Sequence, residues 1–371
     1  MDLIGTQNNS KLYKSITLTF TGDFFPGNLP YRFENGIAEQ FNRNKGRPWL
    51  IKIKKIFNGS DLVITNLESP LLNPKNYPEK KLFAGSTQFA CFLKDLGIEI
   101  VSIANNHILE YGFNGFNSTI AALDQYEIKS IGKYEEGSAN YITYKKHDTT
   151  ISIASFNNIR DFDNSTYIAD FSENIILNMI SKMHASDFII LIFHWGDEYV
   201  QIPSYEQIKL AQKFIDAGSN IIIGHHPHVI QPIMHYNNGI IFFSLGNFFF
   251  DMNYSKNTRI GIVPKITLKK GEHPTYTVEG IYTEADGSPK LIEKGKIAKY
   301  MKRYNQLFYK YLSLPESEYK RKYNIMHRKN RTIQRIFMKK PFIKNFYRIP
   351  FKEYKRIVYK SISLQQKNKY I

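Results

Sequence analysis

The fold is decided by residues 188–248, which read FIILIFHWGDEYV at 188–200, IIIGHHPHVIQ at 221–231 and IIFFSLGNF at 240–248. Each piece begins as a short run of β-branched or aromatic residues, as expected for a strand that is buried on both faces. Each run ends in residues that carry imidazole, carboxylate or amide groups. Such groups, at the carboxyl ends of neighbouring strands, meet at one edge of a parallel sheet.

A helix is predicted between the first two pieces. Ser204 and Gln207 have the spacing of a capping box, and apolar residues from Ile208 to Ile215 recur at helical spacing. Gly218 is suited to end this helix. The segment therefore predicts a crossover in which strand, helix and strand follow one another.

The first half of the chain repeats this pattern three times. The runs and the polar clusters that follow them are Ile16–Phe20 before Gly22-Asp23, Leu62–Thr65 before Asn66-Leu67-Glu68, and Ile100–Ile103 before Asn105-Asn106-His107. A helix is expected from Phe89 to Leu96, ended by Gly97, and another after Gly112. The chain is therefore predicted to be an α/β protein with six polar clusters at one edge.

The clusters have the composition of a metal site. Carboxylate, amide oxygen and imidazole together suit Mn²⁺, Fe²⁺ or Zn²⁺, whereas calcium sites draw almost only on oxygen. Cys91 is the single cysteine, so a thiolate cage is excluded. Burying this many polar groups without partners would cost about 1–3 kcal/mol each, which favours convergence on a metal or a substrate.

In order and spacing, the clusters resemble the CapA family of capsule and poly-γ-glutamate synthesis proteins, a branch of the calcineurin-like metallophosphoesterases. The resemblance covers about residues 16–285, and residues 194–248 are its most specific part. It implies a layered α/β/β/α sandwich and the hydrolysis of a phosphate ester at two metal ions. The uneven distribution of charge along the chain predicts a boundary between a domain at 1–289 and a C-terminal appendage at 290–371.

The resemblance further implies the role of each residue. Asp23 and His228 would bind the first metal, Glu68 would bridge, and Asn106, His194 and His226 would bind the second metal. His107 would not be a ligand but the catalytic group that stabilises or protonates the leaving oxygen.

Three departures limit what the resemblance implies. Phe25 lies where metallophosphoesterases carry a histidine ligand, a gap that CapA proteins share, so a site with one ion is an alternative. Glu68 replaces an aspartate, which lengthens the bridging side chain. Glu110 replaces the aspartate that CapA relatives usually have.

Four further residues are candidates for orienting a ligand or touching the substrate: His225, Glu110, Glu198 and Asn247. For Glu198 an exposed acid at a loop start is an equal alternative. Asn247 is expected to hydrogen-bond the loop that carries the histidines.

The 371 residues contain no long apolar segment and begin without the apolar stretch of a signal peptide, which predicts a cytoplasmic protein. The formal net charge of +17 is concentrated in the appendage. From Lys290 to Ile371 there are 24 Lys plus Arg against 4 Glu, with apolar and aromatic residues between them. Pro341 and Pro350 are expected to break any helix there.

Three interpretations of this basic segment stay open. It suits an anionic membrane surface, which would make the protein peripheral at the inner face of the membrane. It also suits nucleic acid, or a set of solvated helices packed on the catalytic domain.

Three functions follow. The first is a metal-dependent hydrolase of phosphoesterase type that acts on an envelope polymer or its precursor. The second is a non-catalytic component of a polymer-synthesis complex. The third is a nuclease, which only the basic segment favours. The sequence does not distinguish a polypeptide from a polysaccharide, or one oligomeric state from another.

Overall fold

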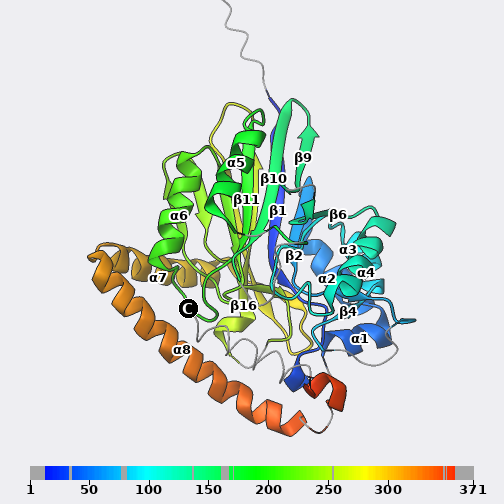
Figure 1. Cartoon of the computed structure of the whole chain (residues 1–371). Coiled ribbons are helices and arrows are strands. Elements are labelled where there is room, and N and C mark those ends of the chain that lie inside the picture. Colours follow the sequence, from blue (N-terminus) through cyan, green and yellow to red (C-terminus); the bar gives the residue numbers. More distant parts are fainter. Residues whose placement is uncertain are drawn as a thin grey trace, which may run out of the picture.

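Two β-sheets lie face to face with helices on their outer sides in the computed structural model (Figure 1). The structure describes residues 13–32, 36–76, 82–135, 138–159, 167–169, 171–252, 255–345, 347 and 349–355. The apolar residues of the strands that point inward form the core between the two sheets. The predicted α/β/β/α sandwich is therefore confirmed.

The first sheet has the order β18-β17-β16-β1-β2-β5-β6, and β15 also pairs with β1. Its parallel strands are β1 (Ile16–Phe24), β2 (Leu62–Leu67), β5 (Ile100–Ser102), β6 (Lys129–Ile131) and β15 (Asn247–Phe249). Its antiparallel strands are β16 (Ile260–Leu268), β17 (Thr275–Thr283) and β18 (Pro289–Ile292). Asp23 of β1 pairs with Asn66 of β2 and with Asn247 of β15.

The second sheet has the order β13-β14-β12-β11-β10-β9. Its four central strands are parallel: β10 (Thr149–Asn157), β11 (Phe188–His194), β12 (Ile221–His225) and β14 (Gly239–Phe242). The edge strands β9 (Tyr141–Lys146) and β13 (Ile233–Tyr236) are antiparallel to their neighbours. His194 pairs with His225, so two of the histidines lie side by side at the end of this sheet.

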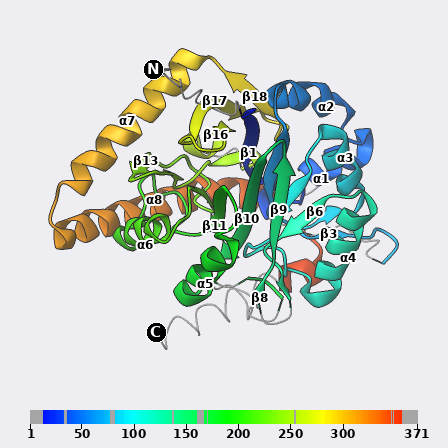
Figure 2. The same cartoon turned by 90° about the horizontal axis from the view of Figure 1, so that it is seen from above.

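Helices cover both outer faces (Figure 2). The first sheet carries α1 (Ile37–Asn44), α2 (Arg47–Lys54), α3 (Gln88–Leu96) and α4 (Gly112–Gln125), and the second carries α5 (Glu173–Met183) and α6 (Tyr205–Asp216). Short elements join them: η1 (Pro30–Arg32), η2 (Lys55–Phe57), η3 (Asn257–Arg259), β3 (Leu71–Leu72), β4 (Gly85–Ser86), β7 (Tyr134–Glu135) and β8 (Ser138–Ala139).

Two of these helices show the predicted end signals. Ser204 accepts a hydrogen bond from the amide of Gln207, and the Gln207 side chain accepts one from the amide of Ser204. Gly97 ends α3 in the left-handed conformation, with φ of 86°. The reciprocal cap and the glycine satisfy backbone groups that a helix end leaves without partners.

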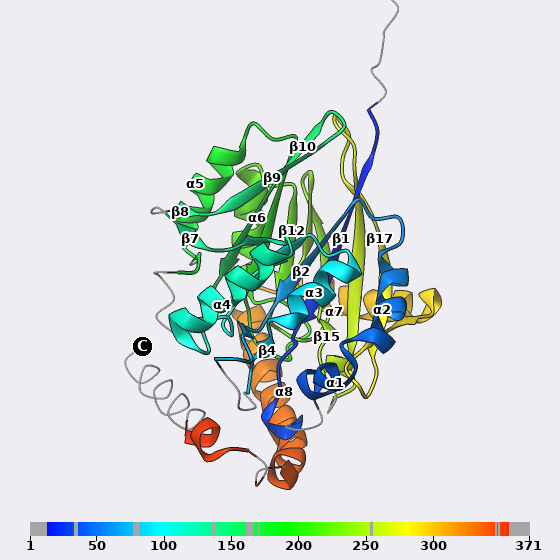
Figure 3. The same cartoon turned by 90° about the vertical axis from the view of Figure 1, so that its right-hand side faces the viewer.

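The C-terminal segment contains the helices α7 (Lys294–Leu312) and α8 (Glu316–Asn345). α8 crosses below the carboxyl ends of the strands (Figures 1 and 3). Phe308 of α7 and Tyr319 of α8 are fully buried in the core that also contains α5 and α6. Within the described residues, no helix has the length and apolar character needed to cross a bilayer.

The prediction that Pro341 breaks the helix is wrong, because α8 continues through it to Asn345. Proline removes one backbone hydrogen bond, to the carbonyl of Phe337. Phe337 is 50 % exposed, so this turn of the helix lies at the surface.

Candidate metal centre

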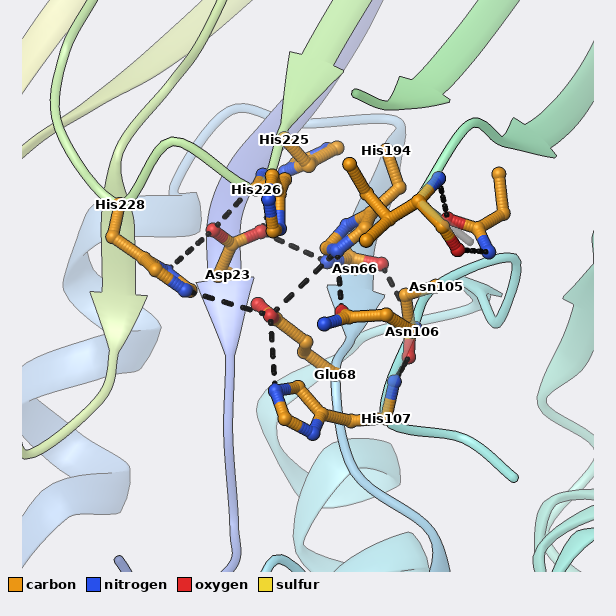
Figure 4. A network of polar contacts seen from close by, with 12 residues as sticks. Asp23, Asn66, Glu68, Asn105, Asn106, His107, His194, His225, His226 and His228 are labelled. Carbon is orange, nitrogen blue, oxygen red and sulfur yellow. Dashed lines mark hydrogen bonds and ion pairs between the residues drawn. The ribbon is translucent and has the colours of Figure 1, made fainter. Parts of the chain in front are cut away.

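Polar residues at the ends of five strands meet in one buried site (Figure 4). Asp23 is the last residue but one of β1, Glu68 follows β2, and Asn106 and His107 follow β5. His194 ends β11, and His226 and His228 follow β12. The structure thus brings together every residue that the sequence assigns to the metals, with His107 beside them.

Close backbone contacts hold these strand ends together. A Cβ atom on Gly22 would lie 1.9 Å from the carbonyl oxygen of Gly246, and one on Gly224 would lie 1.9 Å from that of Phe243. The amide of Asp23 donates to the carbonyl of Gly246 at 3.0 Å. Only glycine permits approaches this close, and they fix where Asp23 and the histidine loop enter the site.

Asp23 is fully buried, and three side chains hydrogen-bond to it. The Asn66 amide donates to Oδ1 at 2.8 Å, His225 Nδ1 lies 3.0 Å from Oδ1, and His228 Nδ1 lies 3.3 Å from Oδ2. Burial would raise the pKa of Asp23, but His225 and His228 hold that pKa well below its ordinary value. Asp23 is therefore ionised.

Glu68 lies at the centre of the site and differs from Asp23 in its contacts. Among the described residues, neither carboxylate oxygen has a hydrogen-bond partner, although both are buried. Oε1 lies 3.7 Å from His194 Nε2, 3.7 Å from His228 Nε2 and 4.0 Å from His107 Nε2. Burial, together with the charge of Asp23, raises the pKa of Glu68 well above its ordinary value. An uncompensated buried carboxylate surrounded by imidazoles fits a bound cation.

Three groups of side chains could hold such an ion. Their ligand atoms lie within 4.8 Å of one another, and the groups are Glu68 with His194 and His226, Asp23 with Glu68 and His228, and Glu198 with His226 and His228. Glu68 belongs to the first two groups, as a bridging ligand would. Asn106 lies beside them, with Oδ1 2.9 Å from His194 Nε2. This donor set fits one or two divalent ions.

The histidines that would bind are held in unusual backbone conformations. His226 has φ of 94° and His228 has φ of 55°, both in the left-handed region. Such conformations cost about 1–3 kcal/mol each and cluster at functional sites. Asn247 Oδ1 lies 2.9 Å from His228 Nδ1, and its amide donates to the carbonyl of Thr258. Asn247 therefore anchors the histidine loop, as its sequence position suggests.

His107 lies at the edge of this group and is oriented by Glu110. Its Nδ1 is 2.9 Å from Glu110 Oε1, and its Nε2 faces Glu68. The ring stacks on Phe83 at 5.3 Å between centroids, and Phe25 meets it edge-on at 6.0 Å. A carboxylate on Nδ1 fixes the imidazole so that Nε2 is the atom available for proton transfer.

Glu198 is partly exposed and lines a cavity of about 450 Å³ beside the site. His107, His228 and Phe83 also line this cavity. Burial would raise the pKa of Glu198, whereas the charges of His226 and His228 lower it. Glu198 is thus a carboxylate next to the site, where it could bind an ion or orient His226.

Two residues near the site were given no role from the sequence. Asn66 hydrogen-bonds Asp23 and lies 3.4 Å from His194 Nδ1. The pairing of β1 and β2 puts Asn66 beside Asp23. Its position directly after a buried apolar run could have indicated a place in the site. Phe83 comes from a segment without periodicity, and only the folded chain shows its contact with His107.

The chain is similar to capsule synthesis proteins over most of its length. The family model of the bacterial capsule synthesis protein PGA_cap matches residues 17–252. The PGA biosynthesis protein CapA of Bacillus subtilis is 33 % identical over 269 residues, which is 69 % of this chain and 68 % of that protein. This chain belongs to the PGA_cap family.

A second CapA protein agrees with this assignment, and solved structures show a weaker likeness. The capsule biosynthesis protein CapA of Bacillus anthracis is 28 % identical over 67 % of this chain and 63 % of its own length. A phosphatase from Mycoplasma pneumoniae aligns with a TM-score of 0.44 and 14 % identity, over 78 % of this chain and 98 % of that one. Sulfate thiohydrolase SoxB of Thermus thermophilus aligns with a TM-score of 0.44 and 11 % identity, over 82 % of this chain and 62 % of that one.

Proposed function

We propose that this PGA_cap protein is a metal-dependent hydrolase of phosphoesterase type that acts in the synthesis of a capsule or another envelope polymer. The observation that carries the proposal is Glu68, a buried carboxylate with no hydrogen bond among the described residues and three imidazole nitrogens within 4.0 Å. Membership of the family supports the place in polymer synthesis. The polymer or its precursor is the proposed substrate.

The ligands proposed for the ion or ions are Asp23, Glu68, Asn106, His194, His226 and His228. Mn²⁺, Fe²⁺ or Zn²⁺ bound there would supply Lewis-acid polarisation of the ester. Burial, with His226 next to it, lowers the pKa of His194 well below its ordinary value, so that imidazole is neutral and can offer a lone pair.

The protein's own acid–base group is His107. Glu110 holds Nδ1, and His107 lines the cavity, so Nε2 is the atom that would deliver a proton to the leaving oxygen of a substrate bound there. Phe83 and Phe25 pack against the ring and keep it in this orientation. His225 contacts Asp23 through Nδ1 and orients that carboxylate.

Substitution of His107 tests the catalytic part of the proposal. We expect His107→Asn to lower the turnover of an aryl phosphate ester by about 10²–10⁴, because general acid catalysis contributes that much. Metal content, measured by mass spectrometry on the same preparation, should stay near that of the wild type. As a control, His147→Asn should change neither quantity, because His147 is an exposed residue in the turn between β9 and β10. A fall in metal content that matches the fall in turnover would contradict the role given to His107.

A second candidate function is a non-catalytic component of a polymer-synthesis complex. Phe25 favours it, because the ring lies fully buried and stacked on Phe250 at 4.5 Å between centroids. In the wider superfamily a histidine ligand would stand there. Metal-loaded protein that binds the ion but hydrolyses no phosphate ester would favour this second candidate.

A further inference from the structure

α8 runs along the loop that links β11 to α6 and is fixed to it by hydrogen bonds. The Tyr319 hydroxyl donates to the carbonyl of Pro203 at 2.7 Å, and the Tyr323 hydroxyl to Asp197 Oδ2 at 2.7 Å. The Asn330 amide donates to the carbonyl of Tyr199 at 2.9 Å. Glu198 lies on this loop, so α8 is held in a defined register beside the cavity that adjoins the metal centre.

The next two turns of α8 supply two cations to that cavity. Arg335 and Lys339 line it together with His107, His228 and Glu198. Residues four apart lie on the same side of a helix, so the guanidinium and the ammonium are neighbours. In the described part of the chain, neither has an ion-pair partner. Two like charges at this spacing repel each other, and a shared anion would remove that repulsion.

The rest of the cavity wall is largely apolar. Leu29, Phe83, Phe250 and Met252 contribute to it, and Glu198 is its only acid among the described residues. A ligand in this cavity would therefore contact the metal centre, an apolar wall and two cations. The combination suits a molecule with an anionic group beyond the bond that reacts.

We propose that Arg335 and Lys339 bind a carboxylate or phosphate group of the substrate, and so make the protein selective for oligoanions. That the other end of this substrate reacts at the metal centre rests on the proposed function. The contact of its anionic group with Arg335 and Lys339 does not. The family model ends at residue 252, so this selectivity would come from a segment outside the family's common domain.

Binding to the full-length protein tests the proposal without any need for turnover. The probes are a tetraglutamate peptide and inorganic tripolyphosphate, which separate carboxylate from phosphate recognition. Their affinities are measured by calorimetry for the wild type and for Arg335→Gln with Lys339→Gln. We expect at least about a tenfold loss for one or both probes, because charge-assisted hydrogen bonds are removed. The remaining affinity should depend less on salt.

Two matched variants control this experiment. Lys329→Gln with Arg331→Gln removes the same charges from exposed positions of the same helix that do not line the cavity, and it should bind like the wild type. Arg335→Lys with Lys339→Arg keeps both charges and should retain most of the affinity. Equal losses in the cavity pair and in the Lys329 and Arg331 pair would overturn the proposal, since they would show only non-specific attraction.

Hydrolysis separates this inference from the proposed function. Substitution of the cavity pair should weaken the apparent affinity for para-carboxyphenyl phosphate, seen as a higher KM, and leave the value for para-nitrophenyl phosphate nearly unchanged. If neither ester is hydrolysed but probe binding still depends on Arg335 and Lys339, the proposed function fails and the anion site stands. If both esters are hydrolysed and the cavity pair affects neither probe nor ester, the anion site fails and the proposed function stands.

Discussion

Asp23 and Glu68 are buried side by side, yet their surroundings differ. Asp23 receives hydrogen bonds from Asn66, His225 and His228, which keep its pKa low in spite of burial. Glu68 has no such bonds among the described residues, and burial next to the charge of Asp23 raises its pKa. The site therefore holds one compensated and one uncompensated carboxylate, and a divalent ion would stabilise the ionised form of the second.

Asp251 gives a pH-dependent prediction at the residue scale. The carboxylate is fully buried beneath the amide of Ile37, and burial raises its pKa to about 6 although Arg32 lies 3.6 Å away. A folded-state pKa above the unfolded value means that this group stabilises the fold below about pH 4, and that the contribution is lost as pH rises through about 6.

The free energy of unfolding of Asp251→Asn should therefore rise by about 2–3 kcal/mol relative to that of the wild type when the pH is raised from 4 to 7. A pKa difference of one unit corresponds to about 1.4 kcal/mol. Urea unfolding at both pH values measures the difference in free energy of unfolding. Asp124→Asn, at an exposed position of α4, is the control. A difference between variant and wild type that is the same at both pH values would contradict the assignment.

At the scale of elements, the strands and their polar ends could be predicted because both signals are local. Short β-branched runs mark β1, β2, β5, β11, β12 and β14, and the metal candidates follow five of them. The path of α8 through Pro341 and its contacts with the loop after β11 depend on tertiary packing. No local pattern could have placed Arg335 and Lys339 in a cavity with His107.

α6 offers a prediction of its own, because it delivers the chain from His194 to the histidine loop. Ser204→Ala removes the hydrogen bond to the amide of Gln207 and should lower the free energy of unfolding by about 1 kcal/mol. Chemical denaturation measures this loss, and Ser181→Ala on the exposed side of α5 should change stability little. Equal stability of the wild type and Ser204→Ala would show that the cap does not support the helix.

At the scale of the molecule, the basic C-terminal segment is packed on the sandwich as far as it is described. Phe308, Tyr319 and Tyr323 belong to the same core as Trp195 and Phe214. The boundary at 289 and 290 stays a prediction, as does binding of the basic segment to an anionic membrane. The part of that prediction that concerns residues 356–371 lies outside the described residues.

Phe308 tests whether this segment unfolds together with the sandwich. Phe308→Ala should cost about 3–5 kcal/mol, because a fully buried aromatic ring is lost from the shared core. Tryptophan fluorescence reports on Trp49 and Trp195. The free energy of unfolding measured by it should fall by that amount, and unfolding should remain a single transition. Phe337→Ala, half exposed on α8, is the control. A fluorescence transition that Phe308→Ala leaves unmoved would mean that the segment is a separate unit.

The central claim is that five strand ends form a site for one or two divalent ions. Its most direct test is the metal content of the full-length protein after dialysis against Mn²⁺ or Zn²⁺ and removal of unbound ion, measured by mass spectrometry. We expect one or two equivalents in the wild type and in the exposed control His273→Ala, and a sharp loss in His226→Ala and Glu68→Gln, which remove ligands from the shared groups. Wild-type protein that retains no divalent ion, or substitutions of His226 and Glu68 that leave its content unchanged, would contradict the account.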